Sequence, residues 1–312
     1  MILTVTANPC VDKTYRVENF TLDRVNRPSL AHTMAGGKGV NVARVYRTLG
    51  GDATATGLLG GLNGKIVAES LAADGIVNAF HHTHQQTRVC IAVIDPVTGT
   101  QTEINEPGPD LGAKETSDLC DHIEGLLSNK SYDYIALCGS LPPGMTTNIY
   151  SRIIQIARRK GVPSVLDASG DALSAGIMAQ PWLVKPNRFE LEEFLGHSVE
   201  SERNALDAAQ ALHHECGISQ VIVTLGSKGA LLVNSEGGWM AKPPAVQMAS
   251  AVASGDSFLA AFLWAVLRKE NWGTALKMGV GAGAANAEII GAGLCSRADI
   301  QKRASQTELC QR

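Results

Sequence analysis

The chain has 312 residues, of which 45% are hydrophobic and 18% are charged, and its formal net charge is -3. The length is sufficient for one large α/β domain or for two ordinary domains, and the composition argues against a disordered chain. The small net charge excludes a global basic surface of the kind that attracts nucleic acid or membrane lipid.

The seven cysteines are scattered, odd in number and without C-x-x-C spacing. This pattern predicts reduced thiols in a cytoplasmic protein rather than a disulfide framework or a zinc site. The first residues, MILTVTANP, lack the basic start and apolar run of a signal peptide. No apolar run approaches the roughly 18 residues of a transmembrane helix, so we expect no membrane contact.

In chain order, the first part predicts core strands at 2–7 and 52–60, and helices at 40–49 and 65–75 that each end at glycine. Polar, extended segments follow a different pattern and are predicted at 13–20, 87–95 and 100–108. We therefore expect two excursions, at roughly 10–35 and 86–107, to form a small antiparallel β lid outside the main body.

From about residue 113 onward, strands and helices alternate. Strands are predicted at 132–140, 163–169, 181–187 and 220–227, and helices at 147–159, 188–195 and 203–215. This alternation predicts an α/β fold, a mostly parallel central sheet with helices on both faces, as one domain over residues 1–312. Ligands of such sheets bind outside the carboxyl ends of the strands, where this sequence places its polar residues.

The stretch AGGKGVNVAR (35–44) places Lys38 and Asn41 beside three glycines at the start of a helix. Glycine lets the backbone approach a ligand closely, and the cation and the amide suit a phosphate or a polyol. An ordinary glycine loop before a helix explains the stretch equally well. It is not a Walker loop, and GAGAAN (281–286) is only a poor match to a dinucleotide-binding fingerprint.

Two further stretches follow predicted strands. In VKPNRFELEEF (184–194), Asn187 and Glu190 are spaced to face one side of a helix, and the same spacing fits a helix-capping box. In VTLGSKGALL (223–232), small residues offer backbone contacts to a flat or phosphorylated ligand, although a tight hairpin is the simpler explanation.

The stretch ASGDSFLAAF (253–262) packs Ser254, Gly255 and Asp256 at the start of an apolar helix. Small and acidic residues favour a helix N-terminus, which is a purely structural explanation. The unpaired N–H groups there also bind anions, and a carboxylate beside an anion site can accept a proton from an attacking hydroxyl.

Six stretches, NPCVDKTY (8–15), AGGKGVNVAR, CGSLPPG (138–144), VKPNRFELEEF, VTLGSKGA and ASGDSFLAAF, occur in this order. Their order and spacing resemble the ribokinase-like (PfkB-type) carbohydrate kinases over essentially the whole chain, and most of all the phosphosugar branch. The resemblance implies an ATP- and Mg²⁺-dependent phosphotransferase that converts fructose 1-phosphate to fructose 1,6-bisphosphate. Tagatose 6-phosphate and fructose 6-phosphate are the alternative substrates.

The resemblance also implies a role for each matching residue. Asp256 is the expected catalytic base, and the backbone of Ala253, Ser254, Gly255 and Asp256 is the expected anion hole. The expected sugar-phosphate ligands are Asp12, Gly36, Gly37, Lys38, Asn41, Arg88 and Ser140. The expected nucleotide-binding residues are Lys185, Asn187, Thr224, Gly226, Ser227, Gly229 and Asn286, with Glu190 acting on Mg²⁺ through water.

The chain departs from the family in one place, because Ala253 and Ser254 stand where the family has Gly-Ala. If residue 253 needs a positive φ, alanine there costs on the order of 1 kcal/mol. A catalytically silent sugar-phosphate sensor is therefore the alternative from a different class, and a nicotinamide dehydrogenase is a distant third. The exposed edge of the lid predicts a homodimer, with a phosphorylated ketohexose and ATP as the other partners.

Overall fold

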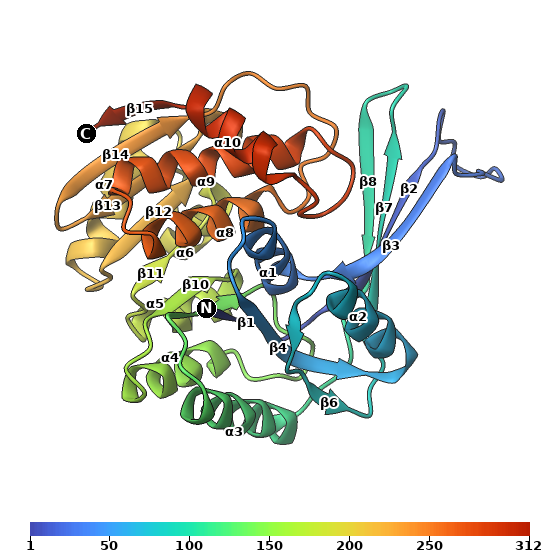
Figure 1. The fold of residues 1–312 in the computed structure, drawn as a ribbon, viewed down its shortest axis with the longest axis horizontal. Helices are drawn as coiled ribbons and strands as arrows, with labels where there is room; N and C mark the ends of the chain where they lie inside the picture. Colours follow the sequence, from blue (N-terminus) through green and yellow to red (C-terminus); the bar gives the residue numbers. More distant parts are fainter.

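The computed structural model describes residues 1–312, which form a large central sheet, a smaller outlying sheet and ten α-helices (Figure 1). The strands of the central sheet are β1 (Ile2–Thr6), β4 (Ala53–Gly60), β5 (Val77–Asn78), β6 (His81–Thr83), β9 (Tyr134–Cys138), β10 (Ser164–Asp167), β11 (Leu183–Val184), β12 (Gln220–Thr224), β13 (Ala230–Asn234), β14 (Gly237–Lys242) and β15 (Glu308–Gln311). Their order is β15-β14-β13-β12-β11-β10-β9-β1-β4-β5, and β6 pairs with β4.

Pairing in the central sheet is parallel from β12 through to β5, and it is antiparallel only at the edge formed by β13, β14 and β15. The expected mostly parallel sheet is confirmed. Because the parallel strands run the same way, the residues that follow β9, β10, β11 and β12 gather at one edge of the sheet.

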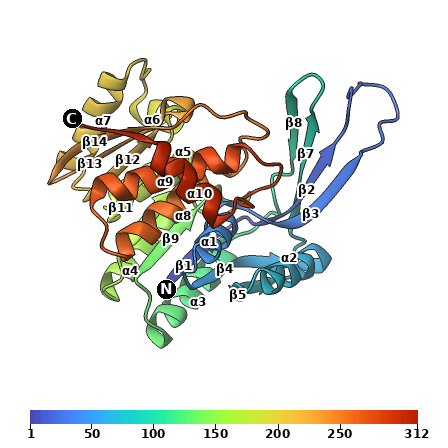
Figure 2. The same cartoon turned by 45° about the horizontal axis from the view of Figure 1, so that its top comes forward.

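Helices cover both faces of the sheet (Figures 1 and 2). They are α1 (Lys38–Thr48), α2 (Gly61–Ala73), α3 (Ala113–Asn129), α4 (Ile149–Arg159), α5 (Gly170–Met178), α6 (Arg188–Leu195), α7 (Glu202–His214), α8 (Ser254–Leu267), α9 (Trp272–Ala287) and α10 (Arg297–Gln306). One core cluster joins α1, α2, α8, α9 and α10 to the sheet, and a second joins α3 to α7 to the other face. Along β9, Ala136 belongs to the first cluster while Ile135 and Leu137 belong to the second, as strand alternation requires. No helix of the chain has the length and apolar character needed to cross a membrane.

The outlying sheet consists of β2 (Cys10–Arg16), β3 (Leu30–Gly36), β7 (Arg88–Asp95) and β8 (Thr100–Asn105), in the order β3-β2-β7-β8. It projects from the body in both views (Figures 1 and 2). Its strands fall within the two excursions predicted to form a lid. The outer pairs are antiparallel, but the central pair, β2 with β7, is parallel. The reason is that each excursion sends its first strand outward, and these two first strands meet in the middle of the lid.

Asp95 ties the two excursions of the lid together. Its carboxylate accepts hydrogen bonds from the backbone N–H groups of Asn19 and Phe20 on one excursion and of Val97 and Thr98 on the other, at 2.9 to 3.4 Å. Although burial raises the pKa of Asp95, these hydrogen bonds outweigh it and hold the pKa below its ordinary value. The lid is therefore one unit rather than two independent hairpins.

Candidate active site

Polar side chains from three neighbouring strand ends meet at the carboxyl edge of the central sheet. Asp167 ends β10, Lys185 follows β11, and Asn187 forms a parallel bridge with Thr224 at the end of β12. The Asp167 side chain is fully buried, and its two carboxylate oxygens lie 3.0 Å from Lys38 Nζ and 3.1 Å from Lys185 Nζ. One buried carboxylate therefore holds two lysine ammonium groups at the edge of the sheet.

The charges of this cluster stabilise one another. Burial alone lowers the pKa of Lys38, but Asp167, Glu190 and Asp256 outweigh it and raise that pKa above its ordinary value. Burial likewise raises the pKa of Asp167, but Lys185 and Lys38 outweigh it and hold that pKa below its ordinary value. Lys38 and Asp167 are therefore both charged at neutral pH, and the paired lysines suit a polyanionic ligand.

Asn187 and Glu190 form the capping box of α6. The Glu190 backbone N–H donates to Asn187 Oδ1 at 2.9 Å, and the Asn187 N–H donates to Glu190 Oε2 at 2.8 Å. The capping interpretation of this pair is confirmed. The second carboxylate oxygen, Glu190 Oε1, lies 3.5 Å from Lys38 Nζ. Capping thus fixes the Glu190 carboxylate at the edge of the lysine cluster.

Asp256 lies in the first turn of α8 and is 5% exposed. Asn41, from the first turn of α1, donates through Nδ2 to Asp256 Oδ2 at 2.9 Å. Burial is the main cause that raises the pKa of Asp256 to about 6; Lys38, Asn41 and Lys185 oppose the rise, and Asp167 adds to it. Asp256 is thus ionised at neutral pH and more basic than an ordinary carboxylate.

Arg44 fixes the orientation of Asn41, a role the sequence interpretation missed. Arg44 Nη1 donates to Asn41 Oδ1 at 3.0 Å, so the amide nitrogen of Asn41 is the atom left to face Asp256. The guanidinium is held in turn by the Ala35 and Ala292 carbonyl groups, at 2.7 and 3.2 Å, and by Asp74 at 2.8 Å. The signal available in the sequence was the three-residue spacing from Asn41, which places both on one helix face.

The start of α8 offers donors without protein acceptors. The N–H of Ser257 bonds to the carbonyl oxygen of Ala253, whereas the N–H groups of Gly255 and Asp256 make no hydrogen bond within the protein. A Cβ added at Gly255 would lie 3.6 Å from Lys185 Nζ, so this ammonium group approaches the same helix end. Two free amides, a helix N-terminus and a lysine therefore lie together at the residue that carries the Asp256 carboxylate, an arrangement that suits an anion.

Ala253 adopts the left-handed conformation, with φ 61° and ψ 11°, at the N-cap of α8. Residue 253 therefore has a positive φ although its side chain carries a Cβ. Asn286 secures this loop, because its amide donates to the Val252 carbonyl oxygen at 2.6 Å and accepts from the Gly293 N–H at 2.9 Å. Asn286 is 0% exposed, and its side-chain hydrogen bonds go to Val252, Ser254 and Gly293.

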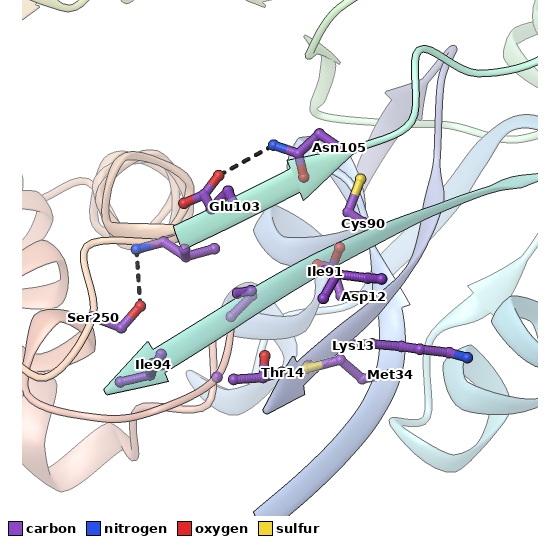
Figure 3. Close-up of a pocket in the computed structure, with 14 residues that line it drawn as sticks. Asp12, Lys13, Thr14, Met34, Cys90, Ile91, Ile94, Glu103, Asn105 and Ser250 are labelled. Atoms are coloured by element: carbon purple, nitrogen blue, oxygen red, sulfur yellow. Dashed lines mark hydrogen bonds between the residues drawn. The ribbon is translucent and has the colours of Figure 1, made fainter. Parts of the chain in front are cut away.

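A small cleft that is open to solvent lies between the lid and loops of the body (Figure 3). Asp12 lines it from β2, and a Cβ at Gly36 would overlap the Asp12 carboxylate. Burial raises the pKa of Asp12, while Cys10, Arg44 and Arg88 lower it. The other lining residues are Lys13, Thr14, Met34, Cys90, Ile91, Ala92, Ile94, Glu103, Asn105, Ser250, Val252, Gly291 and Ala292. The cleft thus runs from the lid to the loop that precedes α8.

Arg88 lies at the base of β7 rather than in the lining of this cleft. Its guanidinium donates to the Asn8 carbonyl oxygen through Nε and Nη2, at 3.2 and 3.1 Å, and to the Glu106 carbonyl oxygen through Nη1 at 2.9 Å. These bonds leave two of its five N–H donors without a protein acceptor. The expected phosphate contact of Arg88 stays a prediction.

The remaining predicted residues lie around the same edge of the sheet. Gly37, with φ 107°, is the N-cap of α1, and a Cβ there would meet Thr6. Ser140 is exposed after β9, next to Gly139, which lies against Lys38. Thr224, Gly226, Ser227 and Gly229 form the β12–β13 connection, a hairpin closed by a bond from the Leu225 N–H to the Gly229 carbonyl oxygen at 2.8 Å.

The chain is similar to known proteins over most of its length. Residues 5–299 match the family described as "pfkB family carbohydrate kinase". A tagatose-6-phosphate kinase from Staphylococcus epidermidis is 36% identical, with 92% of each chain covered. A 1-phosphofructokinase from Rhodobacter capsulatus is 37% identical, over 85% of this chain and 83% of its own length. Phosphofructokinase-2 from Escherichia coli, solved in complex with substrates and products, is 31% identical with a TM-score of 0.91 over 98% of each chain.

Proposed function

The chain belongs to the pfkB family of carbohydrate kinases, and on this premise we propose that it transfers the γ-phosphate of ATP to a hydroxyl of a ketohexose monophosphate. Fructose 1-phosphate, giving fructose 1,6-bisphosphate, is the proposed substrate. Tagatose 6-phosphate and fructose 6-phosphate are the alternative substrates, because one relative is named for the first and a similar structure was solved with the second.

One observation carries the proposal. The Asp256 carboxylate, oriented by Asn41, adjoins the free N–H groups of Gly255 and Asp256 and the Lys185 ammonium group. Phosphoryl transfer to a hydroxyl needs these two things side by side, a base for the hydroxyl proton and an anion site for the transferring group. Neither helix capping nor core packing needs a buried carboxylate at this point.

In the proposed step, the sugar hydroxyl oxygen attacks the γ-phosphorus while its proton passes to Asp256. The bond from the γ-phosphorus to the β–γ bridging oxygen breaks, and ADP leaves with that oxygen. The free N–H groups at the start of α8 and the Lys185 ammonium stabilise the charge on the transferring group. Lys38 contacts Asp167 and Glu190, so we propose that it too binds the transferring phosphoryl group. This role replaces the expected contact of Lys38 with the existing phosphate of the sugar.

The donor set fits Mg²⁺ bound through its water molecules. Glu190 uses Oε2 to cap α6, and both oxygens of Asp167 face lysines, so neither carboxylate offers a free pair of oxygens. Their charge and position nevertheless suit the hydration shell of an ion that keeps several waters. When bound, Mg²⁺ would neutralise phosphate charge. Glu190 would hold its waters, and Asp167 would keep the two lysines in place.

The other assignments extend from these contacts. The turn of Thr224, Gly226, Ser227 and Gly229 adjoins Asn187 and is proposed for the nucleotide. We propose that the sugar hydroxyls are bound by Asp12, Asn41 and the Gly36–Gly37 backbone. Arg88 is proposed to contact the sugar phosphate, and Ser140 to contact the sugar substrate. Asn286 is proposed to position the anion-binding loop.

We also propose a homodimer formed through the lid, in a cytoplasmic protein whose seven cysteines are all free. The outer lid strands β3 and β8 present unpaired edges, and Leu30 and Ile104 on them are 45% and 60% exposed. Light scattering of the wild type and of Ile104→Asp tests this. A dimer that the variant converts to monomer supports it, and a wild-type monomer contradicts it.

Coupled ADP release with fructose 1-phosphate, tagatose 6-phosphate and fructose 6-phosphate tests the activity. We expect turnover with at least one of them, and the highest kcat/KM with fructose 1-phosphate. The strained Ala253 favours the second candidate, a silent sensor. Binding of a sugar phosphate by calorimetry without any ADP release would favour that candidate and contradict the kinase.

A further inference from the structure

Two cysteines and an aspartate gather on the lid at the edge of the cleft. Cys10 and Asp12 lie on β2 and Cys90 lies on β7, and their side-chain sulfur and oxygen atoms are all within 4.8 Å of one another. Cys10 Sγ donates to Asp12 Oδ1 at 2.9 Å. Figure 3 shows Asp12 and Cys90 on neighbouring strands at one end of the pocket.

Strand register explains why the three side chains meet. Asp12 is paired directly with Cys90 across the parallel β2–β7 ladder, and Cys10 is two residues earlier on β2. Residues i and i+2 of a strand share one face of a sheet, so all three project to the same side. Cys10 and Cys90 are 80 positions apart in the sequence, so no short cysteine spacing signals this grouping.

The same register argues against a disulfide. Cys10 is paired with Arg88, so Cys10 and Cys90 are diagonal neighbours, two positions apart along the strands. With about 4.8 Å between strands and about 3.3 Å of rise per residue, their Cα atoms are about 8 Å apart. A disulfide needs Cα atoms closer than about 7 Å, so it would require the strands to slip.

A metal ion bridges this arrangement without such a slip. Zn²⁺ binds thiolate sulfur at about 2.3 Å and carboxylate oxygen at about 2.0–2.2 Å in a tetrahedron, so its ligand atoms lie roughly 3.5–3.8 Å apart. The three ligand atoms already lie within 4.8 Å of one another, close to this range. Asp12 and Cys90 line the open cleft, which leaves room for water as a fourth ligand.

The surroundings suit the charge of such a site. Two thiolates, a carboxylate and a divalent cation together carry one negative charge. Arg88 is paired with Cys10 across the ladder, and Arg44 binds the Ala35 carbonyl oxygen on the strand beside β2. Both guanidinium groups act on Asp12, where they oppose the effect of burial and lower the pKa of the carboxyl group.

We propose that Cys10, Asp12 and Cys90 form a binding site for a thiophilic divalent cation of the Zn²⁺ and Cd²⁺ class, and that the bound cation competes with the sugar phosphate for Asp12. The binding half of the proposal stands on the three side chains alone. The competition half rests on the proposed function, because it needs Asp12 to bind the sugar.

The test of binding is a Cd²⁺ titration of the reduced full-length protein, followed by the ultraviolet thiolate-to-Cd²⁺ charge-transfer band. We expect one equivalent per chain in the wild type and loss of the band in Cys90→Ser and in Cys10→Ser. Cys310→Ser, which removes an exposed cysteine far along the chain, is the matched control and should keep the band. Because even outer-sphere changes weaken metal sites about 10–100-fold, Asp12→Asn should lower the affinity at least about tenfold.

An unchanged band in Cys90→Ser, or no band in the wild type, would overturn the site. Cys90 is only partly buried, so its variant decides the question if the buried Cys10→Ser chain does not fold. For competition, we expect fructose 1-phosphate to raise the apparent Kd of Cd²⁺ in the same titration, with no turnover needed. A Kd unaffected by a sugar phosphate that the enzyme turns over overturns the competition and leaves the kinase intact. Absence of ADP release with every sugar phosphate, beside an intact Cd²⁺ band, instead overturns the proposed function and leaves the metal site.

Discussion

Asn41 donates a hydrogen bond of 2.9 Å to Asp256, joining the first turn of α1 to the first turn of α8 across 215 residues of sequence. The bond can have only this direction, since Arg44 occupies the amide oxygen of Asn41 at 3.0 Å. It lowers the pKa of a carboxylate that burial raises. Asn41 of α1 therefore both orients the carboxylate of the proposed base and lowers its pKa.

Replacing Asn41 with Ala should shift the pH dependence of the reaction. Because the Asn41 hydrogen bond lowers the pKa of Asp256, its loss should move the acidic limb of the kcat profile above its wild-type midpoint. The measurement is kcat at saturating sugar phosphate and ATP across the acidic range. Asn187→Ala, which removes the amide that caps α6 in the same site, is the comparison and should leave that midpoint in place. If the midpoint of the acidic limb in N41A lies at or below that of the wild type, Asn41 does not lower the pKa of Asp256.

The wild type should lose activity as the pH falls through about 6. A base works only when deprotonated, and the pKa of Asp256 is raised to about 6, so protonation below that pH removes the acceptor. The steady-state profile of kcat checks this, with the coupling enzymes shown not to limit the rate. A flat profile down to the ordinary range of aspartate would show that the environment does not raise this pKa in the enzyme–substrate complex.

The same shift has a consequence for stability. A carboxyl group with a raised pKa binds its proton more tightly in the folded state, so its stabilising contribution is complete below the unfolded pKa and is lost as the pH rises through about 6. In Asp256→Asn, which has no carboxyl group at this position, the free energy of unfolding should not show this loss as the pH rises. Denaturant titrations of both proteins on either side of pH 6 measure it, and parallel curves would contradict the assignment.

Replacing Ala253 with Gly should stabilise the protein by about 1 kcal/mol, because glycine adopts a positive φ without the steric cost of a Cβ. Thermal unfolding measures the gain. Lys269→Gly is a matched control, since Lys269 has φ 62° at the other end of α8 and should gain stability without a change in kcat. If A253G is less stable than the wild type, the left-handed conformation is not a source of strain in this loop.

Much of this site follows from local sequence, and the rest follows from pairings that local sequence does not contain. Lys185 and Asn187 follow an apolar strand, Thr224 ends another, and Asp256 lies in the first turn of an apolar helix, so each signals its position within a few residues. Asp167 also ends a strand, but its importance comes from Lys38, 129 residues away, and from Lys185 on the neighbouring strand. No pattern within the segment 163–169 reveals those partners.

The lid gives a similar contrast. The alternating polar pattern in the sequence predicts the two excursions that form the lid. The parallel pairing of β2 with β7 depends instead on how the two excursions lie side by side, which the local pattern does not contain. That arrangement also creates the cluster of Cys10, Asp12 and Cys90. Arg44 was overlooked for a different reason, because an arginine on a helix is usually solvated, whereas this one is 4% exposed and held by four acceptors.

The most direct test of the account is ADP release by Asp256→Asn with fructose 1-phosphate and ATP. Asparagine keeps the shape of the side chain and can still accept from Asn41, but it cannot take the hydroxyl proton. We expect kcat to fall by a factor of about 10²–10⁴ while KM for the sugar phosphate changes little, in a protein at least as stable as the wild type at neutral pH. Turnover close to that of the wild type would contradict the role of Asp256 as the base.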